Sequence, residues 1–300
     1  MALWALLAAA QPPTGMMAGS AVAGPGETVM DVARAHDLGF VEIMAANPGI
    51  DPWLPPEDRA LVLPVIHLIP PGLDRAPLVV NLPEMRLYWR RPNGDVASFP
   101  VGIGRDGMGL GPTVTRVVGK RRNPTWVPPP SVLAEKPWLP AQVPAGPDNP
   151  LGAFSLDLAD GLVRIHGTNL PDGVGRRVSH GCFRLYPEDM ERLFAEVPMG
   201  TTVAIIDEPV KLAWIDGELW LELHPAQHSA DAIEAGLSPT IEAPPDLDRK
   251  IGAAAGQAAW RIDWKTVAWA RNHPQGIPLR ITHPETPAPR SILPASNDFP

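Results

Sequence analysis

The sequence predicts a mostly β protein in which a small βααβ unit comes first and a partly helical extension comes last. The 39 prolines are spread along 300 residues, which favours short strands and stiff loops over helical bundles. After Gly72 the apolar residues alternate with a period of two, as in strands. Two turn signals, Pro92-Asn93-Gly94-Asp95 and Asp216-Gly217, lie between such runs and predict hairpins.

The composition fits a soluble protein with a buried core, since 45% of the residues are hydrophobic and 19% are charged. The formal net charge is −8, which gives no electrostatic footprint for nucleic acid or for an anionic membrane. No run after the N-terminus approaches the ~20 apolar residues of a membrane-spanning helix. We therefore expect neither a nucleic-acid partner nor a membrane span.

The first ten residues, MALWALLAAA, join a short apolar run to small residues and are followed by two prolines. This start resembles a secretory signal peptide that has no Lys or Arg in its first region. We assign residues 1–20 to an export segment. The alternative is an apolar N-terminus that stays on the chain.

Residues 21–71 predict the βααβ unit. Thr28 suits a helix N-cap because Asp31 follows three residues later, and Asn47-Pro48-Gly49 is a strong end signal for a second helix. The stretches GETVMDVA, NPGIDPWLP and LVLP resemble a LysM module, a family that binds N-acetylglucosamine-containing glycans. The alternative is a small helical spacer without a ligand. Pro70-Pro71-Gly72 then predicts a linker.

The second unit spans residues 77–208 and is rich in strand patterns, with a helix predicted to begin at Pro187. Its segment 123–150 holds nine prolines together with Trp126 and Trp138, so we predict a shaped loop over a site rather than a disordered insert. Residues 209–283 form an extension of unknown role, and the proline-rich tail 284–300 is predicted to be disordered.

Cys182 is the one cysteine of the chain, and it stands in the stretch VSHGCFRLYPEDM. A thiol becomes a nucleophile when a base is near, and His166 and His180 are candidates. Gly181 lets the backbone bend, leaving amide N–H groups for an oxyanion, and Arg184 suits a substrate carboxylate. The alternatives are a buried structural cysteine, satisfied core histidines, an arginine paired with a neighbouring acid, and a zinc site made by the thiol and both histidines.

The pairing of IHGTN with SHGCFRL resembles the L,D-transpeptidase (YkuD/ErfK) catalytic domain, whose signature is a histidine followed after a variable loop by S/T-H-G-C. The stretches RLYW, PVGIGR, NPTWVPP and GPDNPLG extend the resemblance across residues 77–208. It departs from the family at Phe183, where a branched aliphatic residue is usual, and at MGLGPTVTR, where the proline is displaced. The resemblance implies roles for eight residues: Cys182 as nucleophile, His166 as general base oriented by the carbonyl of Gly167, His180 and Gly181 as shapers of the nucleophile loop, and Arg184, Ser179 and Trp126 as substrate contacts.

The resemblance also implies a reaction: attack on a peptidoglycan stem tetrapeptide, release of D-Ala, and transfer of the acyl group to an amine, without metal or cofactor. The partners would be stem peptides and glycan strands, the acceptor a stem peptide, a lipoprotein lysine or a free D-amino acid, and the compartment the periplasm. Three alternatives stay open: a carboxypeptidase or endopeptidase using the same thiol, a non-catalytic peptidoglycan-binding protein, and a zinc hydrolase. We expect a chain that starts near Gly72 to keep its chemistry on soluble substrates.

Overall fold

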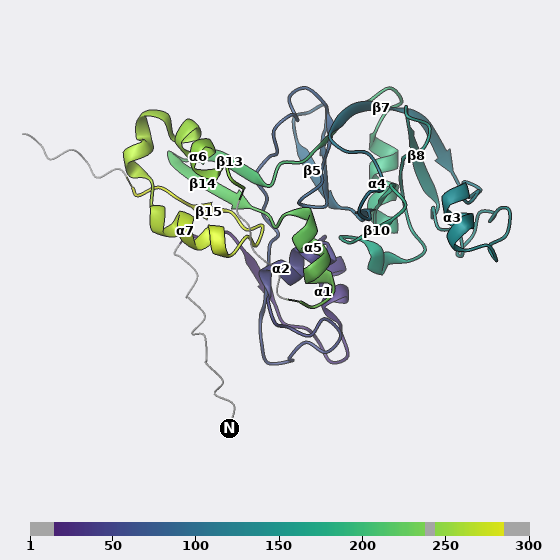
Figure 1. Ribbon diagram of the computed structural model, residues 1–300, viewed down its shortest axis with the longest axis horizontal. Coiled ribbons are helices and arrows are strands. Elements are labelled where there is room, and N and C mark those ends of the chain that lie inside the picture. Colours follow the sequence, from purple (N-terminus) through teal and green to yellow (C-terminus); the bar gives the residue numbers. More distant parts are fainter. Residues whose placement is uncertain (1–14, 238–243, 285–300) are drawn as a thin grey trace, which may run out of the picture.

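The computed structural model describes residues 15–237 and 244–284, and the chain folds as a mostly β protein (Figure 1). The strands of the second unit are β3 (Leu78–Asn81), β4 (Arg86–Arg90), β5 (Val96–Pro100), β6 (Ile103–Gly104), β7 (Thr113–Arg122), β8 (Phe154–Leu158), β9 (Arg164–His166), β10 (Arg177–Ser179), β11 (Phe183–Arg184) and β12 (Thr202–Ile206). The helices of this region are α3 (Pro130–Glu135), the 3-10 turn η1 (Pro171–Gly173) and α4 (Pro187–Glu196).

Eight of these strands form one sheet in the order β11-β9-β8-β7-β12-β3-β4-β5. The sheet curls until its two edges meet, because Gly102, just after β5, exchanges backbone hydrogen bonds of 2.8 and 2.9 Å with Arg184 of β11. A side chain at Gly102 would run into the carbonyl oxygen of Gly173, so the closure requires glycine there. The short strands β6 and β10 pair in parallel beside this closure.

The first unit has the predicted βααβ order: β1 (Gly19–Ala21), α1 (Val29–Ala35), α2 (Phe40–Ala46) and β2 (Leu61–Leu63), with β1 antiparallel to β2. Thr28 and Asp31 make the predicted capping box at the start of α1. The Thr28 hydroxyl accepts from the Asp31 N–H at 3.2 Å, and the Asp31 carboxylate accepts from the Thr28 N–H at 2.8 Å. Asn47 ends α2, as its Pro-Gly neighbours predict.

This unit and the curled sheet share one hydrophobic core, which differs from two modules joined by a linker. Val29, Phe40 and Ile43 belong to the same buried cluster as Leu87 and Ile165 of the sheet. The contact is close enough that a side chain on Gly175 would meet the backbone of Gly39. A chain that starts near Gly72 would expose this core, so the expected independence of the catalytic unit does not fit the structure.

The extension consists of a three-stranded sheet with helices around a core of its own. Figure 1 shows the extension on the left of the molecule, except for its helix 227–234, which lies beside the first unit. Its elements are β13 (Val210–Ile215), β14 (Glu218–Leu223), α5 (Gln227–Glu234), α6 (Leu247–Ala255), the 3-10 turn η2 (Gly256–Arg261), α7 (Trp264–Asn272) and β15 (Leu279–Arg280). The predicted hairpin is present, with positive φ angles of 50° and 77° at Asp216 and Gly217.

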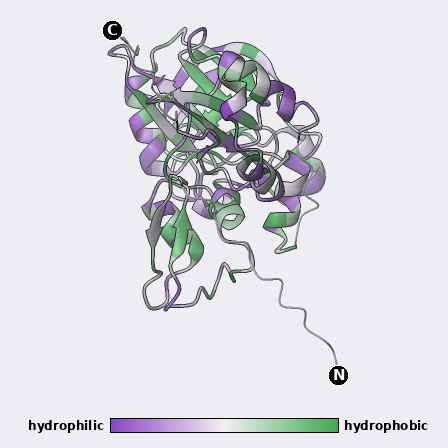
Figure 2. Ribbon diagram, turned by 90° about the vertical axis from the view of Figure 1, so that its left-hand side faces the viewer, coloured by the Kyte–Doolittle hydropathy of each residue, from purple (hydrophilic) through white to green (hydrophobic). Residues whose placement is uncertain are grey.

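Figure 2 shows hydrophobic stretches along many strands and hydrophilic stretches on the helices at the periphery, and the buried residues of the protein are mostly apolar. Most of the predicted export segment and all but the first residue of the predicted tail lie outside the described residues, although Met16 bridges to Leu279 and Gly19 begins β1. Within residues 15–237 and 244–284, every helix is too short or too polar to cross a membrane.

Candidate active site

Cys182 and His166 project from the same face of two neighbouring strands. β11 runs parallel to β9, with Phe183 opposite Ile165 and Arg184 opposite His166. Phe183 and Ile165 point into the hydrophobic core. Because side chains alternate along strands, Cys182, Arg184, Arg164 and His166 all face the other way. The parallel pairing thus gathers a thiol, an imidazole and two guanidinium groups on one polar surface.

Ser179 holds the backbone of the nucleophile loop, residues 179–182. Its hydroxyl accepts from the Gly181 N–H at 3.1 Å and donates to the Cys182 carbonyl at 2.7 Å. The side chain is buried, so it acts inside the loop, whereas we expected it to contact the substrate. Gly181 has a φ of 110°, and a side chain there would collide with Gly109. Glycine is therefore required where the loop turns toward Cys182.

The Cys182 thiol is half-buried, and its Sγ lies 3.9 Å from the carbonyl oxygen of Leu162. Burial raises the pKa of the thiol, while a backbone hydrogen bond from Arg164 and the charges of Arg164 and Arg184 lower it in part. The Cys182 side chain is therefore a protonated thiol in a positive environment at neutral pH. It needs a base at the moment of attack.

His166, the residue expected to act as that base, is buried. Its Nδ1 lies 2.5 Å from the Gly167 carbonyl oxygen. Because a carbonyl oxygen can only accept, Nδ1 carries the proton and Nε2 keeps its lone pair. Burial and then the Arg184 charge lower the pKa of the imidazole to about 3, so the ring is neutral at ordinary pH.

Arg184 is a largely buried cation without an acidic partner among the described residues. Its buried Nε has no hydrogen-bond acceptor. Burial lowers the pKa of its guanidinium, and the other group that acts on it is the Cys182 thiol. An unpaired buried guanidinium is costly unless an anion completes it, so this position suits a carboxylate.

Segment 123–150 forms a shaped loop, as predicted. Trp126 and Val143 pair through two backbone hydrogen bonds of 2.8 Å. The buried amide of Asn149 donates to the carbonyls of Pro124 and Pro144 at 2.7 and 3.0 Å. Trp126 is half-buried, while Trp138 is 74% exposed.

Helix α3 within this loop is tied to the nucleophile loop by charged side chains. His180 Nε2 lies 3.1 Å from a carboxylate oxygen of Glu135, the last residue of α3. It also lies 3.1 Å from the guanidinium of Arg105, which pairs with the same carboxylate. The His180 side chain thus contacts segment 123–150 rather than the Cys182 thiol. The Glu135–His180–Arg105 cluster connects α3 to the nucleophile loop, because His180 lies two residues before Cys182.

Comparisons with known proteins show the family to which the chain belongs. The family model of the L,D-transpeptidase catalytic domain (YkuD) matches residues 76–205. The probable L,D-transpeptidase ErfK/SrfK of Escherichia coli is 39% identical over 258 residues, which cover 83% of this chain and 81% of that protein. This chain belongs to the L,D-transpeptidase family. The probable L,D-transpeptidase YbiS of E. coli is 38% identical over the same shares of both chains.

Among solved structures, the catalytic domain of an L,D-transpeptidase from E. faecium matches 44% of this chain and 96% of that chain, with a TM-score of 0.34 and 22% identity.

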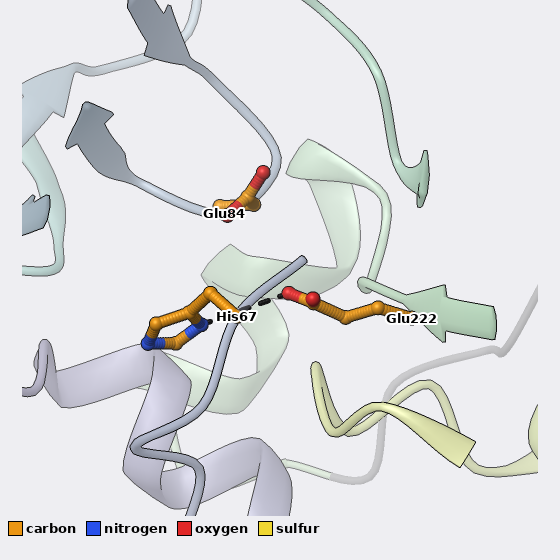
Figure 3. A group of neighbouring side chains, drawn as sticks. All are labelled: His67, Glu84 and Glu222. Carbon is orange, nitrogen blue, oxygen red and sulfur yellow. Dashed lines mark ion pairs between the residues drawn. The ribbon is translucent and has the colours of Figure 1, made fainter. Parts of the chain in front are cut away.

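One group of side chains in this L,D-transpeptidase family member consists of residue types that can bind a metal ion. Of the residues that the structure describes, only His67, Glu84 and Glu222 bring three such ligand atoms within 4.8 Å of one another (Figure 3). The Lys211 ammonium lies between the two carboxylates, 2.8 Å from Glu84 and 2.7 Å from Glu222. A side-chain cation already fills this place, so we interpret the group as a buried charge network.

Two arginines and two acids near the site were not predicted from the sequence. The backbone of Arg164 donates to the Cys182 side chain, and the Arg164 guanidinium pairs with Asp157 at 2.9 Å. The position of Arg164 is predictable in principle, because it lies two residues before His166 on one strand and such residues share a face. Arg105 and Glu135 gave no such signal, since they meet His180 only after folding.

Proposed function

We propose that this protein is an L,D-transpeptidase that acts through a Cys182 thioester. The observation that carries the proposal is the face shared by Cys182, His166 and the unpaired Arg184. A thiol, a neutral imidazole and a free guanidinium are the groups that acyl transfer from a carboxylate-bearing peptide requires. The family to which the chain belongs supports the same reaction.

In the first half-reaction, the Cys182 sulfur attacks the carbonyl carbon of the third residue of a stem tetrapeptide. The thiol proton passes to Nε2 of His166 as the S–C bond forms. When the tetrahedral intermediate collapses, the C–N bond breaks and the departing D-Ala amine takes that proton. The thioester remains on Cys182, and His166 is neutral again.

The main chain of the nucleophile loop supplies the donor for the oxyanion. The Gly181 N–H is already donated to Ser179. The Cys182 N–H has no hydrogen-bond partner among the described residues, so it is available to the oxyanion. Ser179 fixes this amide by holding the peptide units on both sides of it.

In the second half-reaction an amine attacks the thioester carbon and restores the thiol. The amine proton passes to His166 and from there to the sulfur as the S–C bond breaks. Arg184 binds a carboxylate of the donor stem, and Trp126 on the loop contacts the substrate. Water in place of the amine would make the same site a carboxypeptidase.

The setting of this reaction is part of the same proposal. Residues 21–71 resemble a LysM module in motif and βααβ order, so we assign them to glycan binding. Peptidoglycan stem peptides and glycan strands are the partners, with a stem peptide, a lipoprotein lysine or a free D-amino acid as acceptor. The apolar start of the predicted export segment, residues 1–20, directs export to the periplasm, and Gly19 and Ser20 remain part of β1.

Two measurements test the proposal. Sacculi that contain tetrapeptides are incubated with the protein, and mass spectrometry identifies cross-linked, exchanged or hydrolysed muropeptides. Intact-mass spectrometry with a carbapenem then reports the acyl adduct, which a lone cysteine assigns to one position. Wild type should give both signals and Cys182→Ala neither. A folded wild-type protein that takes no adduct contradicts the proposal.

A further inference from the structure

Helix α5 of the extension packs between the first unit and β10, the strand that leads to the nucleophile loop. Ala230 and Ile233 of α5 belong to the core of the curled sheet and the first unit, not to the core of the extension. Figure 1 shows α5 beside α1 and α2, at a distance from α6 and α7. The extension therefore reaches across the molecule with this one helix.

Arg177 makes the direct contact between α5 and the strand that leads to Cys182. It lies in β10, two residues before Ser179, and its side chain is 6% exposed. Its Nη1 donates to the Asp231 carboxylate at 2.6 Å and to the Gln227 carbonyl oxygen at 2.9 Å. Asp106 adds a weaker contact at 3.6 Å from the other side. The shortest contacts of the Arg177 guanidinium are therefore with the extension.

Strand β10 transmits the position of Arg177 to the thiol. It pairs in parallel with β6, and the Arg105 N–H donates to the Ser179 carbonyl at 3.0 Å. Ser179 in turn holds the Gly181 amide and the Cys182 carbonyl. The path from Asp231 to Cys182 contains only the Arg177 side chain, a paired strand and the Ser179 hydroxyl.

The base of the extension is fixed by the Lys211-centred network shown in part in Figure 3. Lys211 donates to the Leu68 carbonyl at 2.8 Å and pairs with Glu84 of the β3–β4 turn and Glu222 of β14. All three charged side chains are fully buried. The extension is therefore attached through Lys211 to the sheet and through α5 to β10, besides the backbone contact of Met16 with Leu279.

We propose that residues 209–283 position the nucleophile loop, and that Arg177 and Asp231 are the positioning residues. The proposal rests on Cys182 being the nucleophile, but it adds a function for the extension. Ordering β10 from the far side places the Cys182 amide and thiol before substrate arrives. Loss of this order should slow chemistry more than it weakens substrate binding.

The test compares Asp231→Asn with Glu234→Gln in the full-length protein. Both changes remove one carboxylate from α5, but Glu234 pairs at 3.3 Å with Arg176, whose guanidinium lies over the Phe40 ring of the first unit. The readouts are the alkylation rate of Cys182 by iodoacetamide, its acylation rate by a carbapenem, kcat and KM on a tetrapeptide, and the thermal midpoint.

Asp231→Asn should lower alkylation, acylation and kcat about tenfold, the rate equivalent of one hydrogen bond to a charged group. KM and the thermal midpoint should stay close to wild type, Glu234→Gln should match wild type, and Asp231→Glu should recover most of the rate. Wild-type rates in folded Asp231→Asn overturn the proposal, as does an equal loss in Glu234→Gln. If the wild type turns over no tetrapeptide yet Asp231→Asn still slows alkylation, the proposed reaction fails and the positioning role stands.

Discussion

The Nδ1 nitrogen of His166 lies 2.5 Å from the carbonyl oxygen of Gly167, the next residue along the chain. This contact fixes the tautomer, because the carbonyl accepts the one ring proton and leaves Nε2 basic. The same burial that makes the contact rigid keeps the ring neutral. The base is thus prepared by its own strand end rather than by an acidic third residue.

We predict that the acid limb of kcat/KM does not come from His166 at its ordinary pKa of 6.5. Burial lowers the pKa of His166 to about 3, so the imidazole stays unprotonated as the pH falls from 7 to 5. Burial also raises the pKa of the Cys182 thiol, so alkylation without substrate should rise only above the range of a free thiol. Pre-steady-state acylation and alkylation across pH check both. An acid limb near 6.5 that disappears in a folded His166 variant is the contrary result.

Asp189→Asn should stabilise the protein at pH 7 and above. Asp189 is fully buried in the first turn of α4, and one of its carboxylate oxygens has no partner. Burial and then Asp37 raise the pKa of its carboxyl to about 7, so the fold keeps a proton that the unfolded chain releases near 3.8. Stability therefore falls as the pH rises from 3.8 through 7.

Asparagine does not titrate, so the stability of Asp189→Asn does not fall in this way as the pH rises. At pH 8 its free energy of unfolding should exceed that of the wild type by at least about 1 kcal/mol, after the weaker helix-dipole interaction is subtracted. Urea unfolding at pH 5 and pH 8 measures the difference. Equal effects of the substitution at both pH values would disprove the titration argument.

Lys211→Met should cost about 3–5 kcal/mol of stability, because it leaves Glu84 and Glu222 as buried carboxylates without their cation. Lys250→Met is the matched control, since Lys250 also pairs with an acid, Glu208 at 2.5 Å, but remains partly exposed. That change should cost less than about 1 kcal/mol. Denaturant unfolding of both variants gives the comparison. Similar costs would mean that the buried network contributes no more than a surface pair.

Removal of residues 1–71 should leave a protein that does not fold stably. The truncation would remove Val29, Phe40 and Ile43 from the buried cluster to which Leu87 of the sheet also belongs. It would also remove Leu68, whose carbonyl accepts from Lys211. Far- and near-ultraviolet circular dichroism of the truncated chain tests this. A cooperative thermal transition with an ordered near-ultraviolet spectrum would restore the two-module description.

Local features could be predicted from the sequence because their causes lie within a few residues. The capping box of Thr28, the Asp216-Gly217 hairpin and the helix start at Pro187 are of this kind. Contacts between distant residues could not be predicted. Lys211 and Glu84 are 127 residues apart, and many other acids could have paired with that lysine.

The candidate catalytic residues fall between these two cases. Cys182 and His166 are predicted from a motif, and their common face follows from the parallel pairing of two strands that the motif does not specify. Ser179 belongs to the same motif, but its role inside the loop depends on a hydrogen-bond geometry that residue order does not contain. The shared core was missed because a Pro-Pro-Gly sequence marks a turn and cannot tell whether the flanking units touch.

The Glu135–His180–Arg105 cluster leads to a prediction about the loop over the site. If His180 acts by holding α3 near the nucleophile loop, then Glu135→Gln and His180→Ala should give similar, moderate losses of kcat/KM on a tetrapeptide, and the double variant should lose no more than either one. His166→Ala should instead abolish turnover, since it removes the base. Lys136→Ala, next to Glu135 and outside the cluster, is the control and should match wild type. Steady-state kinetics of the wild type and these five variants decide the matter, because additive losses would show that His180 acts on the thiol independently of α3.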